Sequence, residues 1–327
     1  MRNKPRLKSL VAALAVATAF HQASAGDPQP LVKDGQKIAF LGDSITANGW
    51  GSPGGYVRLI VDGLAHEGVK VTPIPAGVSG NTSRDMLARL GPDILDKHPD
   101  WMTLSCGVND VWHGDKGVDL ETYKQNITSI VDQATAKGIK VVILTSTPIG
   151  EDDNANNKKL AAYNDFLRQL AKERGLPLAD LSADFQEALA KFKLTPASRN
   201  LTVDGVHMNP EGNILMAAGC LRAFGIPDAG LEKIETAWLS EPNLATVPLQ
   251  AFNARSDIGI TLGQYRQLAK AAQARNTDIA HLCDTLWLKA LSEVVQSHAQ
   301  EPLLDDQQIQ KETTARMQEK IAAVLKE

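Results

Sequence analysis

The sequence has no hydrophobic run long enough to cross a lipid bilayer. A spanning helix needs about 18 to 20 consecutive apolar residues, and the stretch from Leu10 to Phe20 has only 11. A membrane protein with several spans is therefore excluded. Hydrophobic residues make up 43% of the 327 residues and charged residues 22%. This balance excludes a disordered or collagen-like chain and is sufficient for a large hydrophobic core.

Cysteine is also scarce. The three cysteines, Cys106, Cys220 and Cys283, are too few for a disulfide scaffold, and an odd number leaves at least one unpaired. Cys106 lies in an apolar run and is expected in the core. A bridge between Cys220 and Cys283 is compatible with an oxidising compartment, but the sequence does not establish it.

Residues 1–25 have the pattern of a bacterial signal peptide. Four basic residues precede the apolar stretch, and Ala23-Ser24-Ala25 supplies small residues for cleavage after Ala25. The alternative is an uncleaved N-terminal anchor. Export to the periplasm or beyond is the expected outcome.

An excess of positive charge is missing as well. All four charges of the leader are basic. Its removal therefore lowers the number of basic residues from 34 to 30, against 38 acidic residues, and changes the net charge from −4 to −8. Nucleic-acid binding depends on phosphate neutralisation by Lys and Arg, and anionic membranes attract basic segments. We therefore expect neither nucleic acid nor a membrane surface as a partner.

Short apolar runs alternate with helical patterns over residues 26–230. This alternation predicts a parallel sheet with helices on both faces. The expected strands are 37–42, 69–74, 101–106, 140–145 and 178–181, and the expected helices are 56–67, 84–97, 120–137 and 156–174.

The pattern changes over residues 231–327, which we interpret as a helical C-terminal extension without a convincing strand. Helices are expected at 278–299 and 303–326, with a connector at 242–257. The first of these helices carries an apolar stripe through Leu282, Leu286 and Leu291. We expect this stripe to pack on the sheet domain as a helical cap, because a lone helix is marginal in water.

Polar motifs follow the expected strands, at the edge where open α/β sheets bind ligands. Gly42-Asp43-Ser44 ends the first strand, Ala76 to Thr82 follows the second, and Gly107-Val108-Asn109-Asp110 follows the third. Each motif alone is weak evidence. A Gly-rich turn and an Asn that caps a helix are the alternatives for the second and third motifs.

A fourth motif, Asp204-Gly205-Val206-His207, stands before a helix that begins near Pro210. This spacing lets a carboxylate orient a histidine, whose other nitrogen is then free to act as a general base. A metal pair is the rival interpretation, but no third residue at metal-ligand spacing accompanies it.

The four motifs together, in this order, resemble the SGNH hydrolases, also called the GDSL esterase/lipase family. The resemblance covers residues 36–225 and departs at Pro75, where many relatives have Asn. It implies a three-layer α/β/α, flavodoxin-like fold of about five parallel strands, and ester hydrolysis through an acyl-enzyme without metal or cofactor. It also implies a nucleophile and its partners, Ser44, Asp204 and His207, and an oxyanion hole from Ser44, Gly80 and Asn109.

Four further residues close to these motifs are candidates for substrate binding: Asp43, Trp50, Trp112 and His113. The tryptophans could offer a stacking surface for a sugar or an acyl group, and core packing is the alternative.

The sequence favours an exported serine esterase that removes short acyl groups, such as O-acetyl, from carbohydrates. A lysophospholipase or thioesterase shares the chemistry, and the absence of an extended apolar lid argues against it. A glycan-binding module without activity and an acyltransferase are the remaining alternatives.

Overall fold

The computed structural model describes residues 30–196, 198–241, 244, 247–248, 259–298 and 306–326. The expected signal peptide and most of the connector at 242–257 lie outside the described residues. No helix within the described ranges is long and apolar enough to span a membrane.

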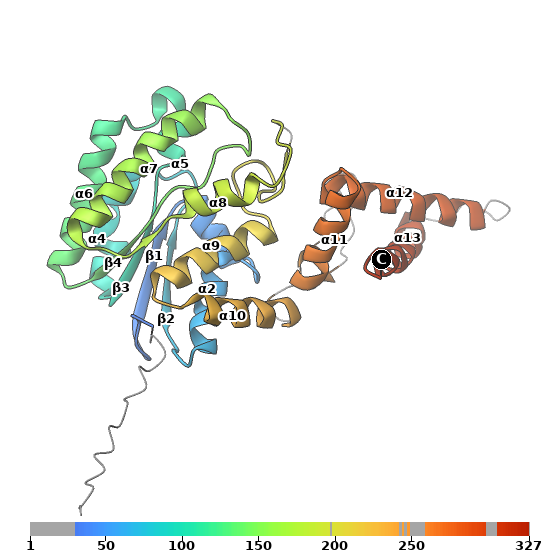
Figure 1. Cartoon of the computed structure of the whole chain (residues 1–327), viewed down its shortest axis with the longest axis horizontal. Coiled ribbons are helices and arrows are strands. Elements are labelled where there is room, and N and C mark those ends of the chain that lie inside the picture. The colour runs from blue at the N-terminus through green and yellow to red at the C-terminus, as the bar shows by residue number, and fades with distance from the viewer. Residues whose placement is uncertain are drawn as a thin grey trace, which may run out of the picture.

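Five parallel strands form one sheet in the order β2-β1-β3-β4-β5 (Figure 1). They are β1 (Lys37–Gly42), β2 (Thr72–Gly77), β3 (Trp101–Ser105), β4 (Lys140–Leu144) and β5 (Leu178–Ala179). The strands β1, β3 and β4 are nearly continuous apolar runs because both faces of the sheet are covered. The expected parallel α/β fold is confirmed.

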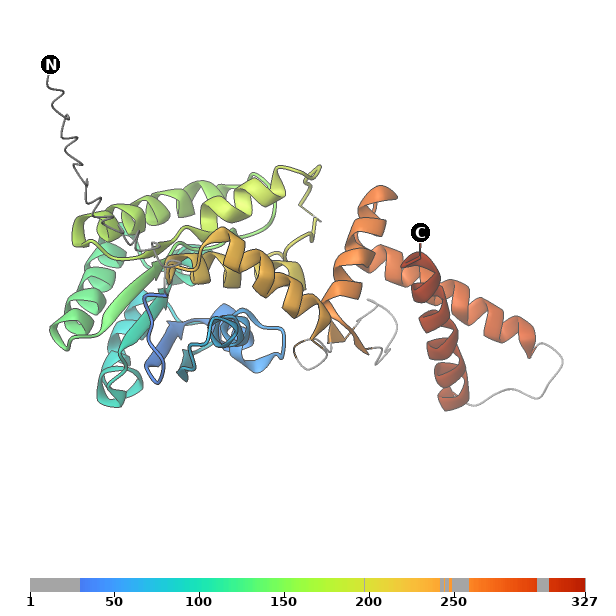
Figure 2. The same cartoon turned by 60° about the horizontal axis from the view of Figure 1, so that its bottom comes forward.

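Helices cover both faces of this sheet. They are α1 (Ser44–Gly51), α2 (Tyr56–His66), α3 (Ser83–Ala88), α4 (Leu90–Asp93), α5 (Val108–Trp112), α6 (Leu120–Ala136), α7 (Ala155–Arg174), α8 (Leu181–Leu189), α9 (Pro210–Ala223) and α10 (Asp228–Ser240), with short 3-10 turns at Leu95–Lys97 and Gly114–Lys116. The helices α3, α6 and α7 pack together on one face, and α2, α9 and α10 on the other (Figures 1 and 2).

The second strand begins three residues later than expected. Gly68 adopts a positive φ of 77°, and the N–H of Val69 bonds to the carbonyl of Leu64, so Val69 belongs to the turn that follows α2 and not to the strand. The strand then contains Pro73 and Pro75, which donate no hydrogen bond. An edge strand tolerates this, and β2 lies at the edge of the sheet.

The single helix expected at 84–97 is divided into α3, α4 and a 3-10 turn. Pro92 explains the division. Its ring has no N–H to bond the carbonyl of Ala88 and clashes with that carbonyl in a regular helix. The break at Arg89 places this side chain at the junction of α3 and α4, where it reaches the ends of β1 and β2.

The apolar stripe of the C-terminal extension does not pack on the sheet domain as expected. Its helices α11 (Leu262–Ala274), α12 (Ile279–Ser297) and α13 (Asp306–Val324) lie beside the α/β unit and not over either face of the sheet (Figures 1 and 2). Leu282 and Leu286 of α12 are covered by Leu268 of α11 and Met317 of α13 in a separate hydrophobic cluster. Helix α11 was not predicted from the sequence. It covers the apolar stripe of α12, which the sheet domain was expected to cover.

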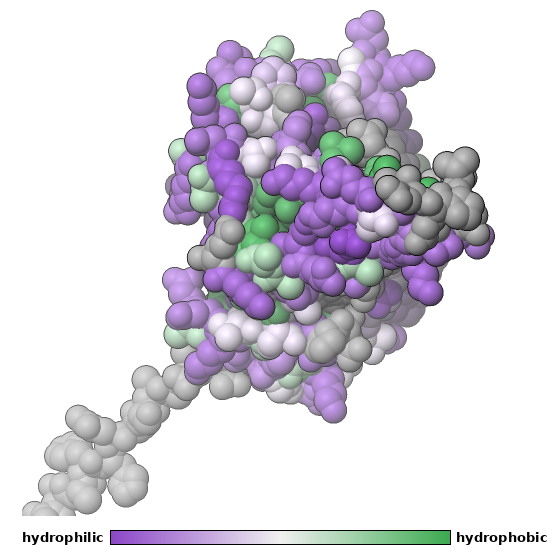
Figure 3. Space-filling model, turned by 90° about the vertical axis from the view of Figure 1, so that its right-hand side faces the viewer, coloured by the Kyte–Doolittle hydropathy of each residue, from purple (hydrophilic) through white to green (hydrophobic). Residues whose placement is uncertain are grey.

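The surface seen from the side of these helices is mainly hydrophilic, with hydrophobic side chains in small groups (Figure 3). The helix α11 is joined to the α/β unit by Leu262, which is buried in the main core, and by Arg266, which pairs with Glu211 of α9. Helix α10, in contrast, belongs to the α/β unit, because its Ile234 and Trp238 are buried there.

Two smaller expectations are also corrected. The extension is not entirely helical, since β6 (Val247–Pro248) pairs with β7 (Gly259–Ile260) in a two-residue antiparallel ladder. Cys220 and Cys283 are both free and buried, the first in the main core and the second in the cluster of α11 to α13. Their places in separate cores preclude the bridge.

Candidate active site

Three side chains form a continuous chain of hydrogen bonds at the carboxyl end of β1. Ser44 is the first residue of α1, and His207 lies in the loop before α9. The Nε2 atom of His207 lies 2.9 Å from the Oγ atom of Ser44, and its Nδ1 atom lies 2.7 Å from Oδ2 of Asp204. The structure therefore brings together the serine, histidine and aspartate that the sequence motifs singled out.

Asp204 is held as an ionised hydrogen-bond acceptor. Its Oδ1 atom accepts the backbone N–H groups of Val206 and His207 at 2.9 and 2.8 Å. Burial raises the pKa of Asp204, but the hydrogen bonds from the His207 ring and these N–H groups outweigh it and leave the pKa below its ordinary value. An ionised carboxylate only accepts, so Nδ1 carries the ring proton and Nε2 can accept from Ser44.

Two backbone N–H groups, in the turns that follow β1 and β2, have no protein partner among the described residues. The N–H of Ser44 is in the first turn of α1, where a helix leaves its donors unpaired. The N–H of Gly80 lies in the turn after β2, and Gly80 has a φ of +80° that favours glycine. Both groups are thus available to an oxygen atom bound at this edge of the sheet.

The Asn109 side chain is buried and its amide orientation is fixed on both sides. Its Oδ1 atom accepts a hydrogen bond from Nε2 of His113 at 3.0 Å. Its Nδ2 atom donates to the carbonyl of Asn81 at 3.0 Å and lies 3.4 Å from Oδ2 of Asp43. The contact with His113 directs the N–H₂ end of Asn109 toward Asp43 and the segment after Gly80.

Arg89 connects the ends of β1 and β2, although the sequence analysis overlooked it. Its Nη2 atom donates to the carbonyls of Gly42 and Ala76, each at 2.9 Å, and its Nη1 atom pairs with Asp93 at 2.7 Å. Nε donates to the side chain of Asn81. One guanidinium thus fixes the distance between the turn before Ser44 and the turn of Gly80. A lone arginine in a helical pattern carries no signal of this role.

Glu151 is a second residue that the sequence analysis missed. Its carboxylate is buried and accepts hydrogen bonds from the backbone N–H groups of Asn200, Leu201 and Thr202 and from the Thr202 hydroxyl. That hydroxyl in turn accepts the N–H of Gly205 at 3.1 Å. Glu151 therefore anchors the loop that carries Asp204 and His207. Its place shortly after β4, at the ligand-binding edge, was the only signal in the sequence.

Asp43 and Asp110 are buried carboxyl groups behind the site. Burial raises the pKa of Asp43 to about 6, although its hydrogen bond with the Ile45 N–H and the charge of His207 oppose this rise. Burial also raises the pKa of Asp110, against the hydrogen bonds that it accepts from Ser83. Asp43 is 2% exposed and caps α1, so the expectation that it contacts substrate is wrong.

The other three candidate binding residues have different surroundings. Trp50 is partly buried against the main core, with the Arg58 guanidinium 4.3 Å from its ring centre. His113 is bonded to Asn109, as described above. Trp112 is 47% exposed and lines a cleft. Only Trp112 therefore offers a free stacking surface next to the hydrogen-bonded chain.

This cleft has a volume of about 410 Å³ and opens beside Asp204. Its walls include Trp112 from α5, Ile149 and Asn154 from the loop before α7, and Arg199 and Gly205 from the loop before α9. Ser44 is not part of its lining. The cleft therefore adjoins the Asp204 side of the hydrogen-bonded chain and not the serine itself.

The chain is similar to known esterases over its α/β unit. It is 30% identical to an acetylxylan esterase of Geobacillus stearothermophilus over 59% of this chain and 96% of that protein, and 27% identical to an arylesterase of Vibrio mimicus over 54% and 82%. The solved structure of the Geobacillus acetylxylan esterase matches with a TM-score of 0.54 and 28% identity, over 60% of this chain and 97% of the other.

The family model of the GDSL-like lipases and acylhydrolases matches residues 40–214, which include Ser44, the Gly80 turn, Asn109 and the Asp204–His207 loop. The match covers more than half of the chain and agrees with the resemblance seen in the motifs. The parallel sheet and the esterase relatives agree with it as well. This chain belongs to the GDSL-like lipase/acylhydrolase family, and it is similar to esterases of that fold.

Proposed function

We propose that this esterase removes O-acetyl groups from carbohydrates through an acyl-enzyme formed on Ser44. The observation that carries the proposal is the chain of two hydrogen bonds, 2.9 and 2.7 Å long, from Ser44 through His207 to Asp204. It is the arrangement that activates a serine hydroxyl as a nucleophile. The acetylxylan esterases among the relatives support acetyl as the acyl group and a glycan as the alcohol.

In the first half of the reaction, Ser44 Oγ attacks the acetyl carbonyl while Nε2 of His207 takes the hydroxyl proton. The carbonyl oxygen becomes an oxyanion, and its proposed donors are the N–H groups of Ser44 and Gly80 and the Asn109 amide. The two backbone donors are fixed before the reaction and need little reorganisation in the transition state, whereas the Asn109 amide exchanges its bond with Asp43 for one with the oxyanion. The bond from the acyl carbon to the alcohol oxygen then breaks, and His207 gives its proton to the leaving alcohol.

In the second half, His207 removes a proton from a water molecule that attacks the acetyl-Ser44 ester. The same donors receive the second oxyanion. Collapse of this intermediate returns the proton from His207 to Ser44 Oγ and releases acetate. Asp204 stays ionised throughout and stabilises the imidazolium form of His207 in both halves.

Acetate release from acetylated xylan, measured beside p-nitrophenyl esters from C2 to C12, tests this function. We expect hydrolysis of acetylated xylan, a maximum at C2 among the aryl esters, and almost complete loss of both activities in Ser44→Ala. Ser182→Ala is a matched control, because Ser182 is a buried serine at the start of α8 whose contact within the described residues is with Thr145 and not with His207. Aryl esterase activity that rises toward C12, without acetate release from xylan, would contradict the proposal.

We also propose that the protein is exported. The basic segment, the apolar stretch and the small residues before Gly26 support export. Mass spectrometry of the protein from the periplasm or medium of a bacterial host tests it. We expect a mature N-terminus at Gly26, and an intact Met1 in the cytoplasm would contradict it.

A further inference from the structure

Arg199 presents one edge of its guanidinium group without a protein partner. Its Nη1 atom donates to the carbonyls of Pro196 and Ser198, at 3.0 and 2.6 Å. These two bonds use both Nη1 hydrogens. Within the described ranges, no hydrogen bond or ion pair engages Nε or Nη2 of Arg199. The remaining edge, with its coplanar N–H groups, is free to bind another group.

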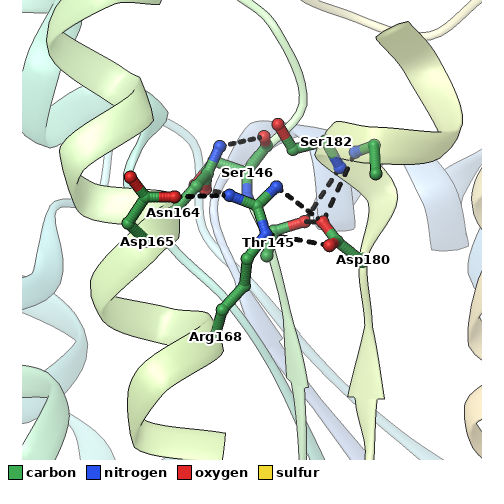
Figure 4. Close-up of polar contacts among 8 residues, drawn as sticks. Thr145, Ser146, Asn164, Asp165, Arg168, Asp180 and Ser182 are labelled. Carbon is green, nitrogen blue, oxygen red and sulfur yellow. Dashed lines mark hydrogen bonds and ion pairs between the residues drawn. The ribbon is translucent and has the colours of Figure 1, made fainter. Parts of the chain in front are cut away.

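Other arginines of this protein use the same edge to bind a carboxylate. Nε and Nη2 of Arg168 donate to the two oxygens of Asp180, each at 2.8 Å (Figure 4). Nε and Nη2 of Arg266 hold Glu211 in the same way, at 2.9 and 3.0 Å. The fork of an arginine matches two coplanar oxygens, and the pair of bonds is both strong and directional.

The guanidinium of Arg199 lies on the wall of the cleft. A Cβ atom built on Gly205 would lie 3.5 Å from its Cζ atom, and Gly205 is itself part of the lining. The carboxylate of the cleft, Asp204, is already engaged by its own loop and by His207. The cleft therefore offers a guanidinium whose Nε and Nη2 donors have no partner among the described residues, together with a carboxylate that already accepts hydrogen bonds.

The cleft lies on the side of the leaving alcohol. His207 gives its proton to that alcohol, and the cleft is lined by the three residues directly before His207 in the chain. Ser44, which holds the acetyl group, is not part of the lining. A group in the cleft thus belongs to the alcohol, which is the sugar in the proposed function. Trp112, on the α5 wall, has the exposed ring that a sugar face packs against.

We propose that this cleft binds a uronic-acid residue of an acetylated glycan. The sugar ring packs on Trp112, and its carboxylate accepts two hydrogen bonds from Nε and Nη2 of Arg199. This inference rests on the proposed function and narrows its substrate class from acetylated carbohydrates in general to those that carry a uronic acid. The negative net charge of the whole chain would repel such a substrate, so its attraction depends on the Arg199 cation in the cleft.

The experiment compares three acetylated methyl glycosides: a glucuronic acid, its uncharged glucuronamide and a 6-sulfated glucose, each acetylated at the same hydroxyl. The measured quantity is kcat/KM for acetate release. We expect wild type to prefer the uronic acid over the uronamide by about tenfold to a hundredfold, the contribution of hydrogen bonds to a charged group. In Arg199→Gln the ratio falls to about one, and Arg199→Lys keeps an intermediate ratio because it lacks the fork.

Lys193→Gln is the matched control. It removes one exposed positive charge from the same loop, outside the cleft, and should keep the wild-type ratio. Trp112→Ala should lower kcat/KM for the acid and the amide alike. A wild-type ratio near one, a ratio kept in Arg199→Gln, or an equal preference for the sulfated sugar would overturn the proposal. Absence of acetate release from all three sugars, with p-nitrophenyl acetate still hydrolysed, would instead contradict the proposed function.

Discussion

The buried carboxylate of Glu151 accepts hydrogen bonds from both the backbone N–H and the hydroxyl of Thr202, each at 2.8 Å. Glu151 precedes its hydrogen-bond partners by 49 to 51 positions in the chain. It nevertheless fixes the position of the loop that contains His207. The geometry of the proposed catalytic residues therefore depends partly on a buried group outside their loop.

We expect Glu151→Gln to lower kcat more than it changes KM. The glutamine N–H₂ would face backbone N–H groups that have no other acceptor, and an unsatisfied buried donor costs about 1–3 kcal/mol. The loop would shift, and His207 with it, so kcat should fall by about tenfold or more. Steady-state kinetics and urea unfolding measure the two effects. Glu187→Gln, at an exposed position on α8, is the control and should change neither.

His113→Ala should lower kcat by about tenfold with little change in KM, because Asn109 loses the partner that orients its amide. His113→Gln keeps a side-chain N–H donor and should recover much of the rate. The same His113→Ala change made in an Asn109→Ala background should add little, since the two residues would act as one unit. Additive losses in the double variant would contradict a positioning role.

Asn109→Ala should reduce kcat by about a hundredfold to a thousandfold, the cost of one oxyanion donor. If Asn109 served only to cap a helix, the variant would lose about 1 kcal/mol of stability and keep its turnover. Turnover and unfolding measured on one preparation separate these two outcomes.

The stability of the protein should depend on the protonation of Asp43. Its pKa is raised from 3.8 to about 6 in the folded state. Folding therefore favours the protonated form of Asp43. The stability that this protonation contributes is complete below about pH 4 and is lost as the pH rises through about 6. Asp43→Asn keeps an oxygen to cap α1 and has no charge. Relative to wild type, it should gain about 1–3 kcal/mol of unfolding free energy between pH 4 and pH 8.

Urea unfolding of both proteins at pH 4, 6 and 8 measures this difference. Asp228→Asn, at the exposed start of α10, is the control and should follow wild type at each pH. A difference between Asp43→Asn and wild type that is constant with pH, or that reverses in sign, would show that burial does not govern this carboxyl group.

A chain that ends at Glu241 should remain folded and active, whereas one that ends at Gly230 should not. The shorter chain loses Ile234 and Trp238 from the main core, and loss of one large buried side chain alone costs about 3–5 kcal/mol. Among the described residues, the longer chain loses from that core the buried Leu262, which contributes about 2 kcal/mol, and the partly buried Leu244. Thermal melting and gel filtration of the two proteins check this, and equal behaviour would be evidence against it.

The sequence was sufficient for those parts of the structure that depend on local pattern. Short apolar runs predicted the parallel sheet, and the motifs at their ends pointed to Ser44, Asn109 and His207, which the structure places at one edge. Residues that act across long separations, such as Glu151 and Arg89, carry no local signal, because their partners are backbone groups from other segments. The packing of the tail was missed for the same reason: the cover of α12 depends on α11, whose weak apolar pattern was not recognised.

The anchor of the catalytic loop has a consequence for protein engineering. The buried carboxylate of Glu151 accepts hydrogen bonds from the loop at residues 200–202. The lining of the cleft includes side chains that take no part in these bonds, among them Trp112, Asn156 and Pro196. These three side chains make no hydrogen bond with the Glu151 carboxylate, although residues 204–206 of the anchored loop also line the cleft. Mutant libraries restricted to those three positions should diversify the accepted glycans while the anchored loop retains its reactive geometry.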